Sequence, residues 1–552
     1  MKIASFDIFD TCLVRKCGTP QNMLDVLSLR VFKSNVSECV RQNFVSLRRI
    51  AEESLLINKS ATLIDIYDKV PQFSSELKKK EELIQLELEL ESQLLVPVIS
   101  IREKITRLRN NGYHIVYISD MYLPSSFLKE ILITYGFFKD GDCIYVSAEC
   151  GAVKGDGSLF KYVAKNESLR YNDWEHFGDN KIADYCIPKK LGINAHLVEY
   201  GYNYYPQCWI NKNFGANFKL SNILAGLCRS IRLSNEKDKQ LDFIVDIILP
   251  YSFSLVNDWL RQAEEDGISK LYFCSRDTYH LFEIAKMLEP IYPSIESHYL
   301  YISRKSLLEG DEKALMLYLQ QIGLATLDYK VGIADVRSQG WTQHTLNEKL
   351  VRYNFNQVKG FYFEMFTCNK IEYLNDYYCE VNKIYVQHNV NSGRLLSNWQ
   401  LYEDYFSMND TAKTIDYKVK NGKAYPIFSG TDDHEHSYIL NAAFYQSLHS
   451  KLLEQFTSAC IDMGLMRYHY ELSNLAISTL TEFFLRPSKK YLPALEEFYS
   501  YSLKYGYIPY VGKLSIVKLL ITNGKRNIWR RGTISNSLPQ WLVNIIYLRK
   551  KL

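Results

Sequence analysis

The sequence lacks the features that would place the protein in a membrane, outside the cell or on nucleic acid. No run of eighteen apolar residues occurs, so we expect no transmembrane helix. The twelve cysteines include no CxxC pair, which favours reduced cytoplasmic thiols over a disulfide framework or a zinc site. The first residues enter an apolar segment directly, so we expect no signal peptide. A net charge of +4 over 552 residues is too weak to indicate a nucleic-acid-binding protein.

The composition is that of a globular chain, with 47% hydrophobic and 23% charged residues. The length predicts two to four domains. The basic charge is concentrated at the end of the chain, where residues 525–552 contain seven Lys or Arg and no acid. Trp529 and Trp541 lie among these cations, a mixture that suits an anionic membrane surface. A docked terminal helix with a solvated face is the alternative.

The periodicity of apolar residues divides the chain into four parts and predicts an α/β protein. Residues 1–200 form a Rossmann-like α/β domain in which 14–100 are helical throughout. A linker at 201–240 leads to a second Rossmann-like α/β domain at 241–430. Residues 431–552 form a mostly α-helical module that carries the basic tail, with 492–503 among its helices.

Two carboxylates and a hydroxyl follow the first predicted strand within five residues. Asp7, Asp10 and Thr11 come after the apolar stretch that begins at Ile3. A parallel strand delivers such groups at its carboxyl end, where open α/β sheets bind ligands. The alternative is that these residues only cap the next helix.

Polar side chains follow three later strands as well. Ser119 ends the apolar segment that starts at Tyr113, and Lys154 comes shortly after a third strand. Asp179 and Asp184 lie at the start of a helix after a fourth strand. Because parallel strands end at one edge of a sheet, these groups are expected to lie together.

This order of motifs resembles the haloacid dehalogenase (HAD) superfamily of phosphatases and phosphotransferases over about residues 1–200. The resemblance implies that Asp7 attacks phosphorus and forms an aspartyl-phosphate. It implies that Asp7, Asp179 and Asp184 serve a Mg²⁺ site. Thr11, Ser119 and Lys154 would bind the phosphate. The helical block after the first strand lies where the superfamily has a cap, which closes over the site and selects the substrate.

One position departs from the family pattern. Family phosphatases usually have a second Asp two residues after the nucleophile as general acid and base, and here Phe9 stands there. Three interpretations remain open. Asp10 takes the role; the phosphoryl group is passed on by another base or hydrolysed slowly; or the domain binds without catalysing. Dehalogenases also lack this Asp, but they do not need the Mg²⁺ residues that are present here.

The second domain has polar residues at successive strand ends: Ser275, Arg276, Asp277, Arg304 and Asp335. The arginines are suited to bind phosphate or carboxylate groups. Alternatively, these charged residues pair with one another and stabilise the domain. Together with the first motif and with Gly340 and Gln343, they resemble a group of large bacterial proteins described as predicted HAD hydrolases, found among genes for capsule, O-antigen and other surface polysaccharides.

These observations predict a Mg²⁺-dependent phosphohydrolase or phosphotransferase. The resemblance implies a phosphorylated sugar, a nucleotide sugar or a lipid-linked glycan as substrate. The alternatives are a glycosyltransferase-like activity in the second domain and a non-catalytic scaffold. We expect a cytoplasmic protein, with contact at the inner face of the membrane through the basic tail as an option, and no nucleic-acid partner.

Overall fold

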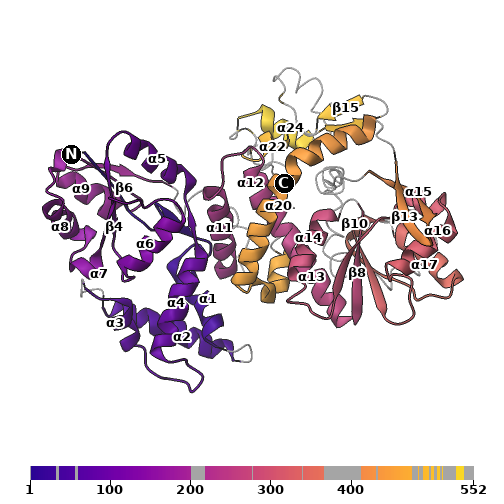
Figure 1. Cartoon of the computed structure of the whole chain (residues 1–552), viewed down its shortest axis with the longest axis horizontal. Helices are drawn as coiled ribbons and strands as arrows, with labels where there is room; N and C mark the ends of the chain where they lie inside the picture. The colour runs from indigo at the N-terminus through magenta and orange to yellow at the C-terminus, as the bar shows by residue number, and fades with distance from the viewer. Residues whose placement is uncertain are drawn as a thin grey trace. The chain divides into compact units, whose positions relative to one another are not determined.

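The computed structural model describes residues 2–32, 36–55, 60–199, 218–275, 278–338, 340–365, 412–429 and 433–474, and shorter stretches between 483 and 542. The chain divides into two compact units, Met1–Lys237 with Asp462–Gly464, and Asp238–Ile461 with Leu465–Leu552. Figure 1 shows the elements of each unit along the chain.

The first unit is built on a five-stranded parallel sheet with the order β5-β4-β1-β6-β7. Its strands are β1 (Ile3–Phe6), β4 (His114–Ser119), β5 (Cys143–Val146), β6 (Trp174–Gly178) and β7 (Asn194–Leu197). The central strand β1 is buried along its whole length, as expected of a strand covered on both faces. In register, Phe6 lies beside Tyr117 and Phe177, so the three middle strands end at one edge. The predicted α/β class is confirmed.

Helices follow the strands and cover the sheet. They are α5 (Ile99–Asn110), α6 (Ser125–Thr134), α8 (Ser158–Asn166) and, after a π-helical turn η3 (Lys181–Cys186), α9 (Ile187–Lys190). On one face, Phe160 and Val163 of α8 pack against Val116, Ile118 and Trp174 of the sheet. This core fixes the positions of the strand ends on which the site depends.

The helical block after β1 enters and leaves through two short strands that were not predicted from the sequence. β2 (Leu13–Arg15) and β3 (Leu95–Pro97) pair antiparallel, and the helices α1 (Pro20–Val31), α2 (Glu38–Glu53), α3 (Leu63–Asp68) and α4 (Lys80–Leu94) lie between them in sequence. The expectation that residues 14–100 are helical throughout is therefore wrong at both ends. Runs of three residues are too short to show a two-residue period.

A further helix, α11 (Phe218–Leu233), belongs to the first unit, although its residues lie in the predicted 201–240 linker. Gly226 on this helix packs against the backbone of Gly18, and a Cβ at Gly226 would collide with it. Such a close approach requires glycine at this position. Residues 200–217 of the predicted linker lie outside the described part.

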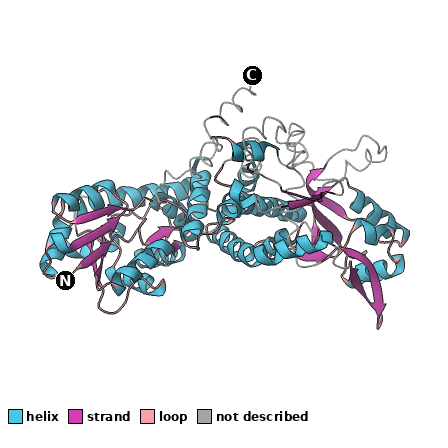
Figure 2. Ribbon diagram, turned by 90° about the horizontal axis from the view of Figure 1, so that it is seen from above, coloured by secondary structure: helices cyan, strands magenta, loops and turns pink. Residues whose placement is uncertain are grey.

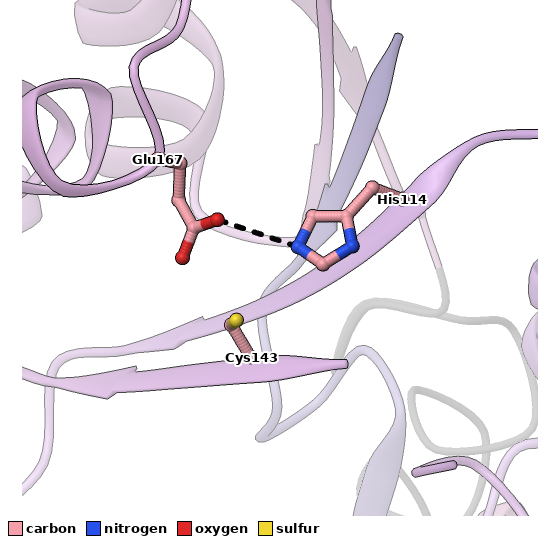
Figure 3. A group of neighbouring side chains, drawn as sticks. All are labelled: His114, Cys143 and Glu167. Carbon is pink, nitrogen blue, oxygen red and sulfur yellow. Dashed lines mark ion pairs between the residues drawn. The ribbon is translucent and has the colours of Figure 1, made fainter. Parts of the chain in front are cut away.

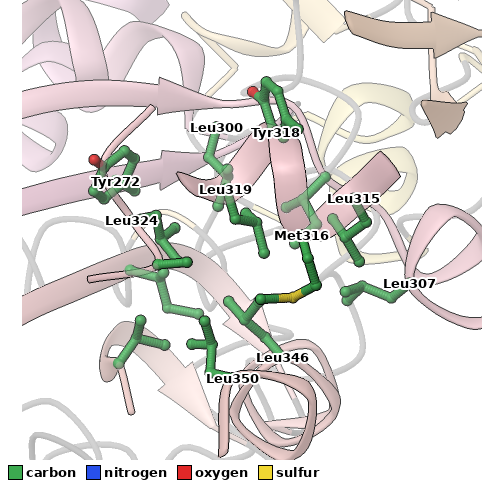
Figure 4. Packing of buried hydrophobic residues seen from close by; sticks show 14 of the residues in the cluster. Tyr272, Leu300, Leu307, Leu315, Met316, Tyr318, Leu319, Leu324, Leu346 and Leu350 are labelled. Atoms are coloured by element: carbon green, nitrogen blue, oxygen red, sulfur yellow. The ribbon is translucent and has the colours of Figure 1, made fainter. Parts of the chain in front are cut away.

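The second unit contains a four-stranded parallel sheet with the order β11-β10-β8-β9. Its strands are β8 (Ile268–Cys274), β9 (Glu296–Leu300), β10 (Lys330–Ser338) and β11 (Lys359–Met365). The helices around it are α13 (Leu249–Glu265), α14 (Tyr279–Leu288), α15 (Arg304–Leu308), α16 (Glu312–Gln321) and α17 (Trp341–Arg352). Figure 4 shows Leu315 and Leu319 of α16 packing with Leu346 and Leu350 of α17 in the core beside this sheet.

A hairpin and a long helix follow in the second unit. β12 (Thr414–Lys420) and β13 (Lys423–Phe428) pair antiparallel, and α20 runs over Asp433–Asp462. Figure 2 shows the strands of both sheets and of this hairpin among the helices. Among the described residues, the helix Leu241–Glu265 is long and apolar enough to cross a membrane, but its apolar window is entirely buried within the folded chain, as in a core helix.

The predicted helix at 492–503 is wrong in its second half. Among the described residues of this range, Leu492–Leu495 is helical, and Tyr499–Ser502 forms strand β14, paired antiparallel with β15 (Gly506–Pro509). The alternation Tyr-Ser-Tyr-Ser has the two-residue period of a strand, which was overlooked in the sequence. Most of the basic tail, including Trp529 and Trp541, lies outside the described residues.

Candidate active site

The loop after β1 places Asp7 at the carboxyl edge of the first sheet. The backbone amide of Asp7 donates to the carbonyl of Phe177 at 2.9 Å, which continues the sheet by one residue. The chain then turns back tightly, with the amides of Cys12 and Leu13 both donating to the carbonyl of Ile8. The Asp7 side chain is 8% exposed, so its carboxylate lies in a site largely closed to water.

Three carboxylates converge at this edge. Asp7, Asp179 and Asp184 each offer an oxygen atom, and these atoms all lie within 4.8 Å of one another. Asp179 directly follows β6, and Asp184 lies on η3. Gly178 permits this arrangement, because a Cβ there would collide with the Asp184 carboxyl group. These three residues were placed together correctly from the sequence, and the structure adds the reason for the glycine.

Lys154 is the cation that holds two of these carboxylates. Its Nζ atom lies 2.5 Å from Oδ1 of Asp7 and 2.7 Å from Oδ1 of Asp184, and all three side chains are buried. The backbone amide of Lys154 donates to the Asp120 carboxylate at 2.9 Å and 3.0 Å, which fixes the start of this turn. One lysine does not balance three carboxylates, so the cluster retains negative charge that a divalent cation would neutralise.

The electrostatics of the cluster reflect this imbalance. Burial raises the pKa of Asp7 well above its ordinary value, and Asp184 and Asp179 add to this, against the opposing effect of Lys154. Burial, Asp10 and Asp184 raise the pKa of Asp179 to about 6. Burial opposes ionisation of Asp184 too, but Lys154 and the hydrogen bond from His176 hold its pKa below the ordinary value.

The two hydroxyls predicted to bind phosphate are on the loop after β1 and on β4, the strand that pairs with β1. Ser119 is the last residue of β4 and is buried. Thr11 is fully buried, and its Oγ1 atom has no hydrogen-bond partner among the described residues. A buried hydroxyl without a partner is costly, so a ligand atom that hydrogen-bonds to it would remove a penalty.

Asp10 pairs with a different cation from the one that holds Asp7. Nη2 of Arg229, on α11, lies 3.1 Å from Oδ1 of Asp10 and also donates to the carbonyl of Gly18. Asp10 has a φ of 54°, in the left-handed region, where Asp is tolerated better than most residues. The negative charge of Asp10 also raises the pKa of Asp179.

Phe9 contacts the base of the helical block that lies between β2 and β3 in sequence. The guanidinium of Arg15 lies 4.4 Å from the centre of the Phe9 ring. The same guanidinium donates through Nε and Nη2 to Glu91 on α4, at 2.9 Å and 2.8 Å. Phe9 therefore packs against the buried ion pair that joins strand β2 to the last cap helix.

Three residues of the site were not predicted from the sequence. His176 contacts Asp184, Asp120 holds the backbone of Lys154, and Arg229 contacts Asp10. His176 and Asp120 carried a usable signal, since one is a polar residue inside an apolar strand and the other directly follows Ser119. Arg229 lies in a segment predicted to be a linker with some helix, and no such signal marks it.

The candidate ligand residues of the second unit are described only in part. Arg276 and Asp277 lie outside the described residues. Ser275 exchanges hydrogen bonds with Ile302, donating to its carbonyl at 3.0 Å and accepting from its amide at 3.2 Å, which ties the ends of β8 and β9 together. Arg304 is exposed at the start of α15, and Asp335 lies half-buried in β10.

Gln343, another residue of the wider motif, has a structural position. It is buried on α17, donates to the carbonyl of Val358 and accepts from the Tyr362 hydroxyl. These bonds join α17 to β11 and to the segment before it.

No protein-family model and no curated protein matches the chain. Solved structures with a similar fold include a HAD family enzyme from Bacteroides thetaiotaomicron, 13% identical, covering 37% of this chain and 96% of that one, with a TM-score of 0.29. They also include a HAD phosphatase from Thermococcus onnurineus, 19% identical, covering 37% and 90% of the two chains, with a TM-score of 0.27. The Bacteroides enzyme with magnesium and inorganic phosphate is 14% identical, with coverage of 37% and 97% and a TM-score of 0.27.

The residues at the carboxyl edge fit a Mg²⁺ ion. Mg²⁺ prefers oxygen ligands and usually binds one or two carboxylates together with phosphate and water. The donors here are carboxylate oxygens, and their spacing is compatible with a shared cation. Burial, together with the neighbouring carboxylates, raises the pKa values of Asp7 and Asp179, and a bound cation would stabilise their ionised forms.

Proposed function

We propose that the first unit is a Mg²⁺-dependent phosphohydrolase or phosphotransferase that works through an aspartyl-phosphate on Asp7. The observation that carries this proposal is the set of neighbours around Asp7. Its carboxylate pairs with Lys154, and one of its oxygens lies within 4.8 Å of an oxygen of Asp179 and of Asp184 at the carboxyl edge of a parallel sheet. An isolated carboxylate and an anionic phosphate group repel each other. A buried carboxylate beside a lysine and a cation site is suited to attack such a group, because the positive charges reduce this repulsion.

In this mechanism an oxygen of Asp7 forms a bond to phosphorus as the bond to the leaving oxygen breaks. Lys154 stabilises the charge that gathers on the phosphoryl oxygens. Thr11 and Ser119 donate hydrogen bonds to those oxygens. Asp7, Asp179 and Asp184 would hold Mg²⁺, and its positive charge would offset the repulsion between the Asp7 carboxylate and the phosphoryl group. The acyl phosphate formed on Asp7 is then cleaved at phosphorus by water or by an acceptor hydroxyl, which releases the Asp7 carboxylate.

Asp10 is our candidate for the general acid and base, in place of the residue that Phe9 replaces. It would protonate the leaving oxygen in the first half-reaction and accept a proton from water in the second. The proposal is supported by its effect on the pKa of Asp179, which indicates that its charge lies near the cluster. Arg229 would position it for this work.

For the substrate we propose a phosphorylated sugar, a nucleotide sugar or a lipid-linked glycan of bacterial surface polysaccharide assembly. The support is the sequence resemblance of the first motif and of the strand-end residues near Ser275, Arg304 and Asp335. Association with the inner face of a membrane stays a prediction, because most of the basic tail lies outside the described residues.

Phosphate release from a panel of sugar phosphates and nucleotide sugars, with Mg²⁺ and with EDTA, tests the proposal. We expect Mg²⁺-dependent release by the wild type and none by Asp7→Asn. A variant on the surface of the same unit, Lys161→Met, serves as the control and should retain activity. Equal release by wild type and Asp7→Asn, or release that is insensitive to EDTA, would refute the proposal.

A further inference from the structure

A second group of metal-ligating side chains lies at the opposite end of the first sheet. His114 is the first residue of β4 and Cys143 is the first residue of β5, while Glu167 follows the last turn of α8. The register pairs Cys143 with Val116, so His114, two residues earlier, lies on the same face as Cys143. α8 packs on this face, and Figure 3 shows the three side chains pointing into one space.

The three ligand atoms are close enough to share one ion. A ring nitrogen of His114, the Sγ atom of Cys143 and a Glu167 oxygen all lie within 4.8 Å of one another. Ligand atoms on one tetrahedral zinc ion lie about 3.3–3.7 Å apart, as bond lengths of about 2.0–2.3 Å require. One pair, Nε2 of His114 and Oε2 of Glu167, already has this spacing at 3.4 Å.

The histidine nitrogen is poorly satisfied without an ion. Nε2 of His114 is buried and has no hydrogen-bond partner among the described residues. Its distance from Glu167 is too long for a good hydrogen bond, and buried polar atoms normally have a partner. A ligand bond from Nε2 to a metal would satisfy this atom.

The carboxylate is already oriented by a neighbour. The hydroxyl of Tyr145, two residues after Cys143 on the same face, donates to Oε1 of Glu167 at 2.5 Å. This bond occupies one oxygen and leaves Oε2 directed to His114. Metal ligands are commonly held by such outer hydrogen bonds, which fix their orientation.

We propose that His114, Cys143 and Glu167 form a Zn²⁺-binding site, with water as the fourth ligand. A thiolate, a carboxylate and a neutral imidazole carry two negative charges, which balance one divalent cation in this half-buried position. A sulfur and a nitrogen ligand select Zn²⁺ over the hard ions Mg²⁺ and Ca²⁺. The thiol proton of Cys143 is released to solvent when the sulfur–metal bond forms.

This site is separate from the proposed phosphoryl-transfer site. His114 and Ser119 are the two ends of β4, which places them about 16 Å apart at the usual rise of a strand. The ion would join two neighbouring strands to the end of α8. It would therefore stabilise the first unit and not enter the reaction at Asp7.

A zinc site was disfavoured from the sequence because the cysteines lack CxxC spacing. The absence of CxxC spacing excludes only zinc sites whose ligands lie close together in the sequence. Here the three ligands are far apart in the chain and are brought together by strand pairing and by the packing of α8.

Titration of the full chain with Co²⁺ in saturating Mg²⁺ tests the proposal, because Mg²⁺ then occupies the carboxylate site. We expect a thiolate-to-cobalt charge-transfer band that saturates at one Co²⁺ per chain and is displaced by Zn²⁺. Cys143→Ser should abolish the band. His114→Gln removes a direct ligand and should weaken metal binding by more than the roughly tenfold that loss of an outer hydrogen-bond partner costs. Cys150→Ser, which changes another half-buried cysteine of the same unit, should leave the band unchanged.

Two further measurements distinguish loss of metal binding from loss of folding. Zn²⁺ should raise the thermal unfolding midpoint of the wild type and not that of Cys143→Ser. If Cys143→Ser does not fold, Glu167→Gln replaces it, with circular dichroism as the check. The absence of a band in the wild type would overturn the proposal, as would a band that Cys143→Ser leaves intact.

Discussion

His176 places its Nε2 atom 3.2 Å from Oδ1 of Asp184 and is itself held by a chain of donors inside the sheet. The indole nitrogen of Trp174 can only donate, and it lies 2.7 Å from Oγ of Ser5. The ionised Asp184 carboxylate can only accept a hydrogen bond, so Nε2 of His176 carries the proton and donates it. In the neutral imidazole, Nδ1 is then the acceptor for the Ser5 hydroxyl at 2.7 Å.

Replacement of His176 should weaken metal binding more than turnover. We expect His176→Leu to raise the Mg²⁺ concentration for half-maximal activity about 10–100-fold, the usual cost of losing an outer hydrogen bond to a metal ligand. His176→Gln is the matched variant, because its amide nitrogen reaches approximately the place of Nε2, and it should recover most of this loss. Measurement of activity against Mg²⁺ concentration distinguishes them, and identical curves for both variants would contradict the donor role.

Lys154 is expected to contribute to both stability and catalysis. Lys154→Met leaves Asp7 and Asp184 buried without their cation, which should cost about 3–5 kcal/mol of unfolding free energy in EDTA. The loss should be smaller in Mg²⁺, which replaces the missing charge. Turnover should fall about 10²–10³-fold. Chemical denaturation with and without Mg²⁺ checks the first result, and a loss of stability that Mg²⁺ does not reduce would argue against a shared cation site.

Asp10 is expected to affect the chemical step and not the formation of the site. We expect Asp10→Asn to lower turnover about 10²–10⁴-fold, the usual contribution of a general acid and base. Asn tolerates the left-handed backbone of this position, so the loop should be retained. Rapid acid quenching should show phosphoenzyme accumulating in the variant. Unchanged steady-state hydrolysis in Asp10→Asn would assign proton transfer to another group.

The sequence predicted the parts of the site that follow strand ends. Asp7, Lys154, Asp179 and Asp184 were placed together because parallel strands terminate at one edge, a rule that needs only strand positions. The contact between Arg229 and Asp10 could not be predicted in this way. It depends on the packing of α11 through Gly226, a tertiary contact with no local pattern.

Very short strands could not be predicted from the sequence either. β2 and β3 contain three residues each, and each is fixed by its partner across the base of the cap. The role of Phe9 shows the same limit. Its position was recognised as a departure from a family pattern, but its contact with Arg15 depends on the ion pair between Arg15 and Glu91, residues distant in sequence.

The Arg15–Glu91 pair should tolerate removal of both partners better than removal of one. Arg15→Met leaves the Glu91 carboxylate buried and unpaired, which should cost about 3–5 kcal/mol of unfolding free energy. The double variant Arg15→Met/Glu91→Leu should lie closer to the wild type, because no uncompensated charge remains. Denaturant titration of the single and double variants measures the difference. Strictly additive losses would show that the two side chains do not interact in solution.

His449 should make the stability of the chain depend on pH. Burial lowers its pKa well below the ordinary value, and the neighbouring His280 adds to this effect. The folded protein therefore keeps His449 neutral, while the unfolded chain binds a proton below about pH 6.5. The contribution of His449 to the free energy of unfolding is fully present above that pH. Below it, the free energy of unfolding falls by up to about 1.4 kcal/mol per pH unit. Denaturation between about pH 7 and pH 5 should show a flatter slope for His449→Leu than for the wild type, whereas His344→Gln, a more exposed histidine, should retain the wild-type slope. An unchanged slope in His449→Leu would mean that this imidazole is protonated in the folded state.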